Sequence, residues 1–188
     1  MFKKPLKIFL AIIVFMGFLI SYLLSDFNPI YQNNGFVHLS NKLKEAQSED
    51  LSSFVKIQTE IYKKMEDPKC PCEIATNYIG SFSVYRHGYS PTKSLYQLKI
   101  KRKYSKMDCF KFLLLNTDFK HVYADSTRKT FGVKEASKFY FNKDIKELNE
   151  KEVLTIIAML KNPSLYDPIR NKEGLKNRVR VLERILHK

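Results

Sequence analysis

The sequence has little of what metal centres and redox sites require. It holds three cysteines, Cys70, Cys72 and Cys109, and four histidines. A single proline separates Cys70 from Cys72, which is not the C-x-x-C spacing of zinc and redox motifs, and no histidine is spaced with them as a metal ligand. We therefore expect no metal and no cofactor. In an oxidising compartment, one disulfide to Cys109 would leave one thiol over; three unpaired thiols are the alternative.

The chain also lacks any nucleic-acid-binding motif, an alternating strand pair and an internal repeat. Its formal net charge is nevertheless +14, and the first 25 residues add only Lys3, Lys4 and Lys7 to the cations. A basic domain favours anionic partners such as phospholipid headgroups or pyrophosphates, unless the lysines form a plain solvated surface. We expect no nucleic-acid partner. Apolar residues at 44% exclude a disordered chain.

Residues 8–24 form an uncharged apolar run, IFLAIIVFMGFLISYLL. As a helix it would span about 26 Å, which approaches the thickness of a hydrocarbon core. The lysines before it and Asp26 after it predict an N-terminus in the cytoplasm and a remainder across the membrane. A cleaved signal peptide would need a shorter run and a small-x-small site, which Ser21-Tyr22-Leu23 fits poorly. Residues 1–25 are therefore expected to be an uncleaved transmembrane anchor.

Beyond the anchor, residues 26–48 show little periodicity and read as a linker or wrapping segment. Helical spacing of apolar residues predicts helices over about 50–66 and after Cys72, then further helices in the chain from residue 91 to the end. Ser105 with Asp108 and Asn149 with Glu152 form capping-box starts. The class is all-α, with one helical domain over residues 49–188.

Four segments of the C-terminal half carry a family signature. Their sequences are Arg102-Lys103-Tyr104-Ser105-Lys106, then Gly132-Val133-Lys134-Glu135-Ala136-Ser137-Lys138-Phe139-Tyr140-Phe141-Asn142-Lys143, then Pro163-Ser164-Leu165-Tyr166-Asp167-Pro168, and Arg178-Val179-Arg180-Val181-Leu182-Glu183-Arg184. With them, the segment from Lys99 onward resembles the peptidoglycan glycosyltransferases, the transglycosylase domains of monofunctional transglycosylases and class A penicillin-binding proteins. Helical spacing alone would not reproduce the Pro-Ser-Leu-Tyr-Asp-Pro loop at this distance.

The resemblance implies a lysozyme-like helical fold on a transmembrane helix, divergent or truncated in its N-terminal half. It also implies a single-pass protein of the bacterial cytoplasmic membrane with its domain outside the cytoplasm. The implied partners are lipid II or a glycan strand, and proteins of cell-wall synthesis. Basic residues of such a site neutralise a pyrophosphate leaving group. By resemblance, Arg102, Lys103 and Arg178 are the candidates for substrate binding.

The catalytic carboxylates of that family are not matched here. The family's second glutamate aligns with Lys93, a G-x-S-T-x-x-Q-Q string is absent, and Lys111 stands where the family often has glutamate. Glu49, in Glu49-Asp50-Leu51-Ser52-Ser53-Phe54, is the nearest candidate for the first glutamate, but an ordinary place in the first turn of a helix is the favoured explanation. Residues 120–129 are an insertion relative to the family.

Three functions remain open at this point. The first is a binding or regulatory pseudoenzyme of lipid II metabolism. The second is an active lipid II polymerase whose carboxylates have moved, with Glu60, Glu66 or Glu73 in their place. The third is a basic adaptor at the membrane surface with no glycan role. The first is the preferred interpretation, because glycosyl transfer of this kind needs a carboxylate base.

Overall fold

The computed structural model describes residues 3–66, 68–80, 90–119 and 131–188. Within these ranges the only strand-like pairing is an isolated bridge between Asp118 and Phe131, so the all-α class is confirmed. The elements in chain order are α1 (Lys3–Leu24), η1 (Pro29–Gln32), α2 (Asn34–Ser48), α3 (Ser52–Lys64), α4 (Pro71–Thr76), η2 (Asn77–Ile79), α5 (Pro91–Lys103), α6 (Lys106–Asn116), α7 (Gly132–Phe141), α8 (Glu150–Lys161) and α9 (Lys172–Leu186).

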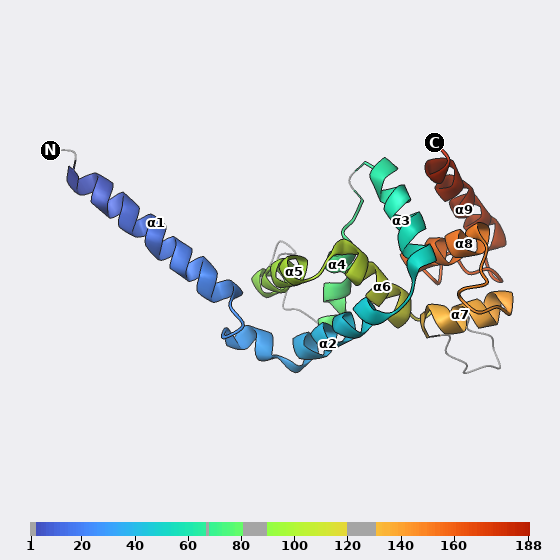
Figure 1. The fold of residues 1–188 in the computed structure, drawn as a ribbon, viewed down its shortest axis with the longest axis horizontal. Coiled ribbons are helices and arrows are strands. Elements are labelled where there is room, and N and C mark those ends of the chain that lie inside the picture. The colour runs from blue at the N-terminus through green and yellow to red at the C-terminus, as the bar shows by residue number, and fades with distance from the viewer. Residues whose placement is uncertain (1–2, 67, 81–89, 120–130) are drawn as a thin grey trace.

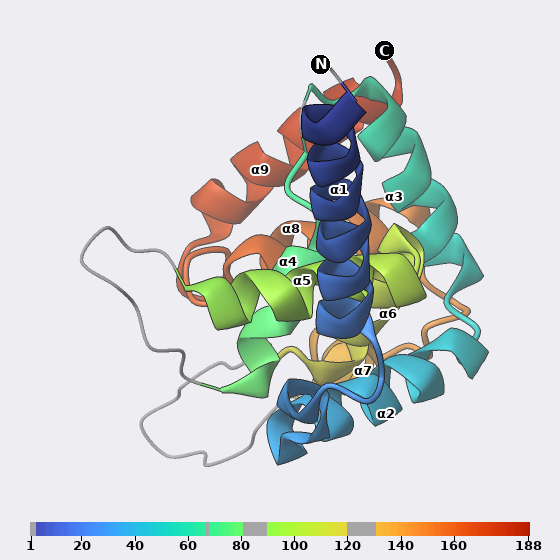
Figure 2. The same cartoon turned by 90° about the vertical axis from the view of Figure 1, so that its left-hand side faces the viewer.

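Helix α1 projects away from a body formed by the other helices (Figure 1). Its apolar side chains from Ile8 to Tyr22 are exposed, unlike those of a core helix. By length and composition it is apolar enough to cross a membrane. Viewed from its own side, α1 crosses in front of α5, the helix that lies against its C-terminal end (Figure 2).

The body is built around two hydrophobic clusters that meet at α6. Phe110 and Leu114 of α6 enter one cluster with α3, α7, α8 and α9, and Phe112 and Leu113 enter the other with η1, α2, α4 and α5. Two different faces of α6 are thus buried, whereas Lys111 between them is only half-buried. The run Phe110-Lys111-Phe112-Leu113-Leu114 therefore makes α6 the central helix of the body.

Both predicted capping boxes are confirmed. Ser105 Oγ accepts from the Asp108 backbone N–H at 3.1 Å, and the Asp108 carboxylate accepts from the Ser105 N–H at 2.8 Å. Asn149 and Glu152 make the same reciprocal pair at the start of α8, at 2.9 and 2.8 Å. Each cap satisfies donors that the first turn of a helix leaves unpaired and contributes about 1 kcal/mol.

The predicted linker over residues 26–48 is wrong for its second part. Residues 34–48 form α2, which buries Phe36, Leu39, Leu43 and Ala46 in the second cluster. The glycine that suggested a linker has another cause: a Cβ on Gly35 would lie 2.2 Å from the carbonyl oxygen of Ile79. The helix expected after Cys72 is the short helix α4, which ends at Thr76 and is followed by η2. The insertion at 120–129 lies outside the described residues.

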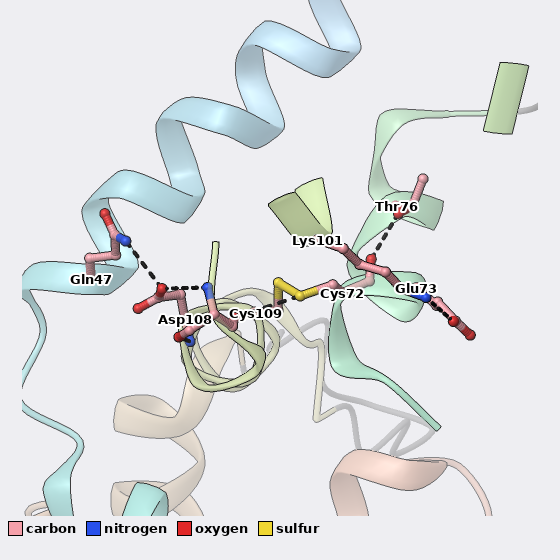
Figure 3. Close-up of a disulfide and its surroundings, with 8 residues drawn as sticks. Gln47, Cys72, Glu73, Thr76, Lys101, Asp108 and Cys109 are labelled. Carbon is pink, nitrogen blue, oxygen red and sulfur yellow. Dashed lines mark hydrogen bonds and ion pairs between the residues drawn. A yellow bond between two sulfur atoms is a disulfide. The ribbon is translucent and has the colours of Figure 1, made fainter. Parts of the chain in front are cut away.

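A disulfide joins Cys72 of α4 to Cys109 of α6 and leaves Cys70 as a free thiol (Figure 3). The expectation of one disulfide to Cys109 with one thiol left over is therefore confirmed. Both bridged residues are buried, and Asp108 beside Cys109 also accepts from Gln47 of α2 at 3.2 Å. The bridge and its neighbours hold α2, α4 and α6 together.

Candidate functional site

A cavity of about 710 Å³ lies between the two hydrophobic clusters. Helices α3, α4, α6, α8 and α9 contribute to its walls, which are mainly apolar. Its lining residues are Gln58, Ile61, Tyr62, Met65, Pro68, Lys69, Pro71, Ile74, Tyr78, Phe110, Leu113, Thr117, Ile157, Leu160, Lys161, Pro163, Arg178 and Leu182. Pro163 belongs to the proline-bounded loop that carried the family signature, so this loop shapes the cavity.

Arg178 of α9 and Gln58 of α3 bring unpaired polar atoms to this cavity. Arg178 Nε and Gln58 Oε1 are buried, and neither has a hydrogen-bond partner within the described part of the chain. Gln58 as a whole is only 7% exposed. A buried donor or acceptor without a partner costs about 1–3 kcal/mol. A ligand that supplies an acceptor to Arg178 and a donor to Gln58 would remove that cost.

The charges around the cavity are of one sign. Lys69 and Lys161 are exposed at its rim, Arg178 lies deeper, and the described lining contains no carboxylate. Burial raises the pKa of the Tyr62 phenol above its ordinary value, so this group is a neutral hydrogen-bond donor at physiological pH. Such a cavity suits an anion that carries apolar groups.

The structure separates Arg102 and Lys103 from Arg178. Both residues end α5, are exposed and do not line the 710 Å³ cavity. Lys103 Nζ lies 5.9 Å from the ring centroid of Tyr104. Their assignment to substrate binding remains a prediction, and of the three candidates only Arg178 reaches this cavity.

Glu49 follows the last residue of α2 and does not lie in the first turn of α3. Its carboxylate pairs with Lys134 of α7 at 2.8 Å, and its backbone carbonyl accepts from Lys111 Nζ at 2.7 Å. Glu49 is absent from the cavity lining. Its surroundings are those of a surface ion pair between helices.

The other candidate glutamates are also away from the 710 Å³ cavity. Glu60 pairs with Lys63 on the exposed face of α3, and Glu66 is exposed. Glu73 lines a neighbouring pocket of about 590 Å³, where it pairs with Lys101. This ion pair connects α4 to α5, which indicates a structural role for Glu73 (Figure 3).

Metal binding is not suggested by the arrangement of potential ligands. Across the described ranges, no three His, Cys, Asp or Glu side chains gather closely enough to hold an ion. Lys93, the residue aligned with the family's second glutamate, stands in the first turn of α5, and its backbone N–H donates to Ser90 Oγ at 3.4 Å. It does not line the cavity either.

A sequence model of the transglycosylase family matches residues 92–186, which are 95 of the 188 residues. The chain belongs to the transglycosylase family. The resemblance stated from the C-terminal motifs is therefore confirmed, as is the lysozyme-like helical class. The match covers α5 to α9 and so includes Arg178, whereas Glu49, Gln58 and Glu73 precede it.

Characterised relatives agree with this membership. Penicillin-binding protein 4 of Bacillus subtilis is 33% identical over 87 residues, 46% of this chain and 13% of that protein. Penicillin-binding protein 1A of Neisseria cinerea is 30% identical over 111 residues, 58% of this chain and 13% of that protein. A biosynthetic peptidoglycan transglycosylase of Chromobacterium violaceum is 35% identical over 54 residues, 29% of this chain and 24% of that protein. The matched part is thus less than a quarter of each relative.

Sequence reasoning did not find Gln58, Tyr62, Lys69 or Lys161 as cavity residues. Gln58 lies on the buried face of α3, between Phe54 and Ile61. A polar residue at helical spacing within an apolar face was the sequence signal that could have identified it. Lys161 ends the capped helix α8 directly before the signature loop. The two lysines otherwise resemble the many exposed lysines of the chain.

Proposed function

We propose that this protein is a membrane-anchored member of the transglycosylase family that binds lipid II or a glycan strand without polymerising it. Peptidoglycan glycosyltransferase-like chemistry is the role that its relatives support. The proposal adds that this chain keeps a site for the anionic, lipid-linked substrate and has lost the catalytic base. It would then act as a binding or regulatory subunit of cell-wall synthesis.

One observation carries the proposal: the large cavity holds cations and unpaired polar atoms but no carboxylate among its described lining residues. Activation of an acceptor hydroxyl requires a general base, usually a positioned carboxylate or histidine. Charge on a pyrophosphate, in contrast, is stabilised by groups such as Arg178 and the two rim lysines. The cavity therefore supports binding of a pyrophosphate and does not support activation of an acceptor hydroxyl.

Helix α1 supports the anchoring part of the proposal. Its 22 residues would span about 33 Å, close to the thickness of a hydrocarbon core. With lysines before the apolar run, the positive-inside rule would place the N-terminus in the cytoplasm and the body on the outer side. Lipid II presents its disaccharide at that same surface.

The experiment is a paired assay on the full-length protein in detergent micelles. We expect no polymer from labelled lipid II, and we expect lipid II binding that survives high salt, because nonspecific attraction between exposed charges is screened. Arg178→Gln should weaken this binding at least tenfold. Arg180→Gln is the matched control, since Arg180 is exposed on the same helix and does not line the cavity.

The other two functions are outcomes of the same assay. Polymer formation by the wild-type chain would overturn the pseudoenzyme, and Glu73→Gln would then test the glutamate of the neighbouring pocket. Binding that disappears in high salt, equally in both arginine variants, would favour a basic adaptor with no glycan role.

A further inference from the structure

We propose that α5 lies on the bilayer surface, with Leu98 inserted at the level of the headgroups and Arg102 and Lys103 bound to anionic phospholipids. This inference rests on the proposed membrane anchoring by α1. It does not depend on lipid II or on the 710 Å³ cavity. It gives a role to the basic end of α5, which the cavity leaves unexplained.

The first step is the contact between α5 and the last turn of α1. Lys99 Nζ donates to the carbonyl oxygen of Leu24 and pairs with Asp26 at 2.8 Å. The same ammonium group lies 4.9 Å from the ring centroid of Tyr31, and Lys99 is only 8% exposed. A buried lysine held by three partners places α5 within one side-chain length of the end of α1.

The second step is that this junction is fixed by further bonds. Tyr96 of α5 donates to the carbonyl oxygen of Ile30 at 2.7 Å. Tyr31 Oη and Asn28 Nδ2 both donate to the carbonyl oxygen of Leu23, at 3.0 and 3.2 Å. The last carbonyls of a helix have no partner within the helix. Here side chains from the body supply partners, so α1 and α5 are held in one relative arrangement (Figures 1 and 2).

The third step concerns the depth of α5 in the bilayer. If the apolar run ends at Leu24, the hydrocarbon boundary lies at the carbonyl that Lys99 contacts. The headgroup layer beyond that boundary is about 5–8 Å thick on each side. A helix with its side chains is about 10 Å across. Because a single lysine side chain joins α5 to that carbonyl, we place the near side of α5 at the level of the headgroups.

The exposed side chains near this junction suit that layer. Phe27 is 88% exposed directly after α1, and Leu98 is 54% exposed beside Lys99. Leu98 and Arg102 are four residues apart and so share a face of α5. Within the described residues, no carboxylate forms an ion pair with Arg102, and Lys103 acts on Asp26 only at longer range than Lys99 does. Helix α5 contains no acidic residue, so its face is complementary to anionic lipid.

The test uses the fact that the chain contains no tryptophan. Full-length Phe27→Trp, Leu98→Trp and Val181→Trp variants would be reconstituted in vesicles containing phospholipids brominated near the headgroup. Val181 is the control, because it is 41% exposed on α9, far from α1 in Figure 1. We expect bromine to quench tryptophan at 27 and 98, and not at 181.

The outcomes separate this proposal from the anchor on which it rests. Absence of quenching at position 27 would overturn the anchoring and, with it, part of the proposed function. Quenching at 27 without quenching at 98 would overturn the contact of α5 and leave the anchor and the lipid II proposal intact. Quenching at all three positions would mean that the body lies on the membrane in some other way, and would also overturn the inference.

The charge component has its own measurement. In vesicles of equal composition, bromine is placed either on phosphatidylglycerol or on phosphatidylcholine, and the quenching of Leu98→Trp is compared. A cation near an anionic surface favours association about fivefold, so brominated phosphatidylglycerol should quench more strongly. Adding Arg102→Gln and Lys103→Gln should abolish the difference, whereas Lys172→Gln with Arg180→Gln on α9 should leave it unchanged. Equal quenching by both lipids in the parent variant would overturn the anionic-lipid assignment.

Discussion

Breaking the Cys72–Cys109 disulfide should lower the stability of the body by several kcal/mol. The bridge joins residues 37 positions apart, so the unfolded chain carries a closed loop of 38 residues. The loop-closure relation gives about 4 kcal/mol for a loop of this size at 25 °C. A domain of this kind typically has about 5–15 kcal/mol in total. Loss of the bridge would therefore remove a large part of its stability.

The assay is urea unfolding of the full-length protein in a mild detergent, followed by the near-ultraviolet circular dichroism of its tyrosines. With a slope of about 2 kcal/mol per molar urea, a loss of 4 kcal/mol lowers the midpoint by about 2 M. The reduced wild type isolates the effect of the bond. The double variant Cys72→Ala, Cys109→Ala is needed beside it, since a single change at Cys72 would leave Cys70 free to pair with Cys109.

Cys70→Ser is the control for the loss of a thiol alone. Cys70 is outside the bridge and only partly buried, so its midpoint should stay within about 0.3 M of wild type. A midpoint shift below about 0.5 M on reduction, which is a quarter of the expected shift, would refute the loop-closure argument. It would mean that the helices on either side of the bridge already keep the unfolded chain compact.

Three other changes test separate features. Glu49→Gln should leave lipid II binding unchanged and lower the free energy of unfolding by less than about 1 kcal/mol, because its partner Lys134 is exposed. Gly132→Ala should lower it by about 2–3 kcal/mol in urea unfolding, since Gly132 has φ +82° and a Cβ would lie 2.6 Å from a carbonyl oxygen of α6. The Lys143 ammonium, and then the backbone N–H of the helix cap, hold the pKa of Glu152 below its ordinary value of 4.5. Its stabilising contribution is therefore present above pH 4.5 and lost as the pH falls through the lower folded-state value, and Glu152→Gln should flatten the stability–pH curve in that acidic range.

Helix ends were the most predictable part of the fold. Ser105 and Asn149 occupy positions where a short side chain can accept from the first-turn N–H groups, and each is followed three residues later by an acid. These interactions are local, so their residues can be found without knowing the tertiary structure. The same holds for Asn171, which accepts from the Gly174 N–H at 3.0 Å.

Helix α2 was not predicted because the residues at its start are typical both of loops and of helix N-termini. Asn33 and Gly35 suggested a loop, yet Asn33 accepts from the Gly35 N–H at 2.9 Å as an N-cap. Gly35 is required by its approach to the backbone of Ile79, a contact between segments 44 positions apart. Only the tertiary structure reveals such a contact. The helical spacing of Phe36, Leu39 and Leu43 was the sequence signal for α2 that the linker prediction overlooked.

The cavity could not have been predicted, because its polar atoms come from distant positions. Gln58 of α3 and Arg178 of α9 lie far apart in the sequence, and no local sequence pattern indicates that they line the same cavity. The resemblance to the family pointed to Arg102, Lys103 and Arg178 together. Packing places α5, which carries Arg102 and Lys103, at the opposite cluster from α9.

Lys111, a departure from the family pattern, has a structural role in this chain. Lys111, where the family often has glutamate, donates to the carbonyl oxygens of Gln47 and Glu49 at 3.2 and 2.7 Å and so completes the C-terminal end of α2. A cation is favoured at that end of a helix, and a carboxylate would face those oxygens without a proton to donate. The carboxylate of Glu49 is in turn held by Lys134. Lys111 and Glu49 thus attach α2 to α6 and α7, and a carboxylate at position 111 would break this helix junction without placing a base among the described residues of the cavity.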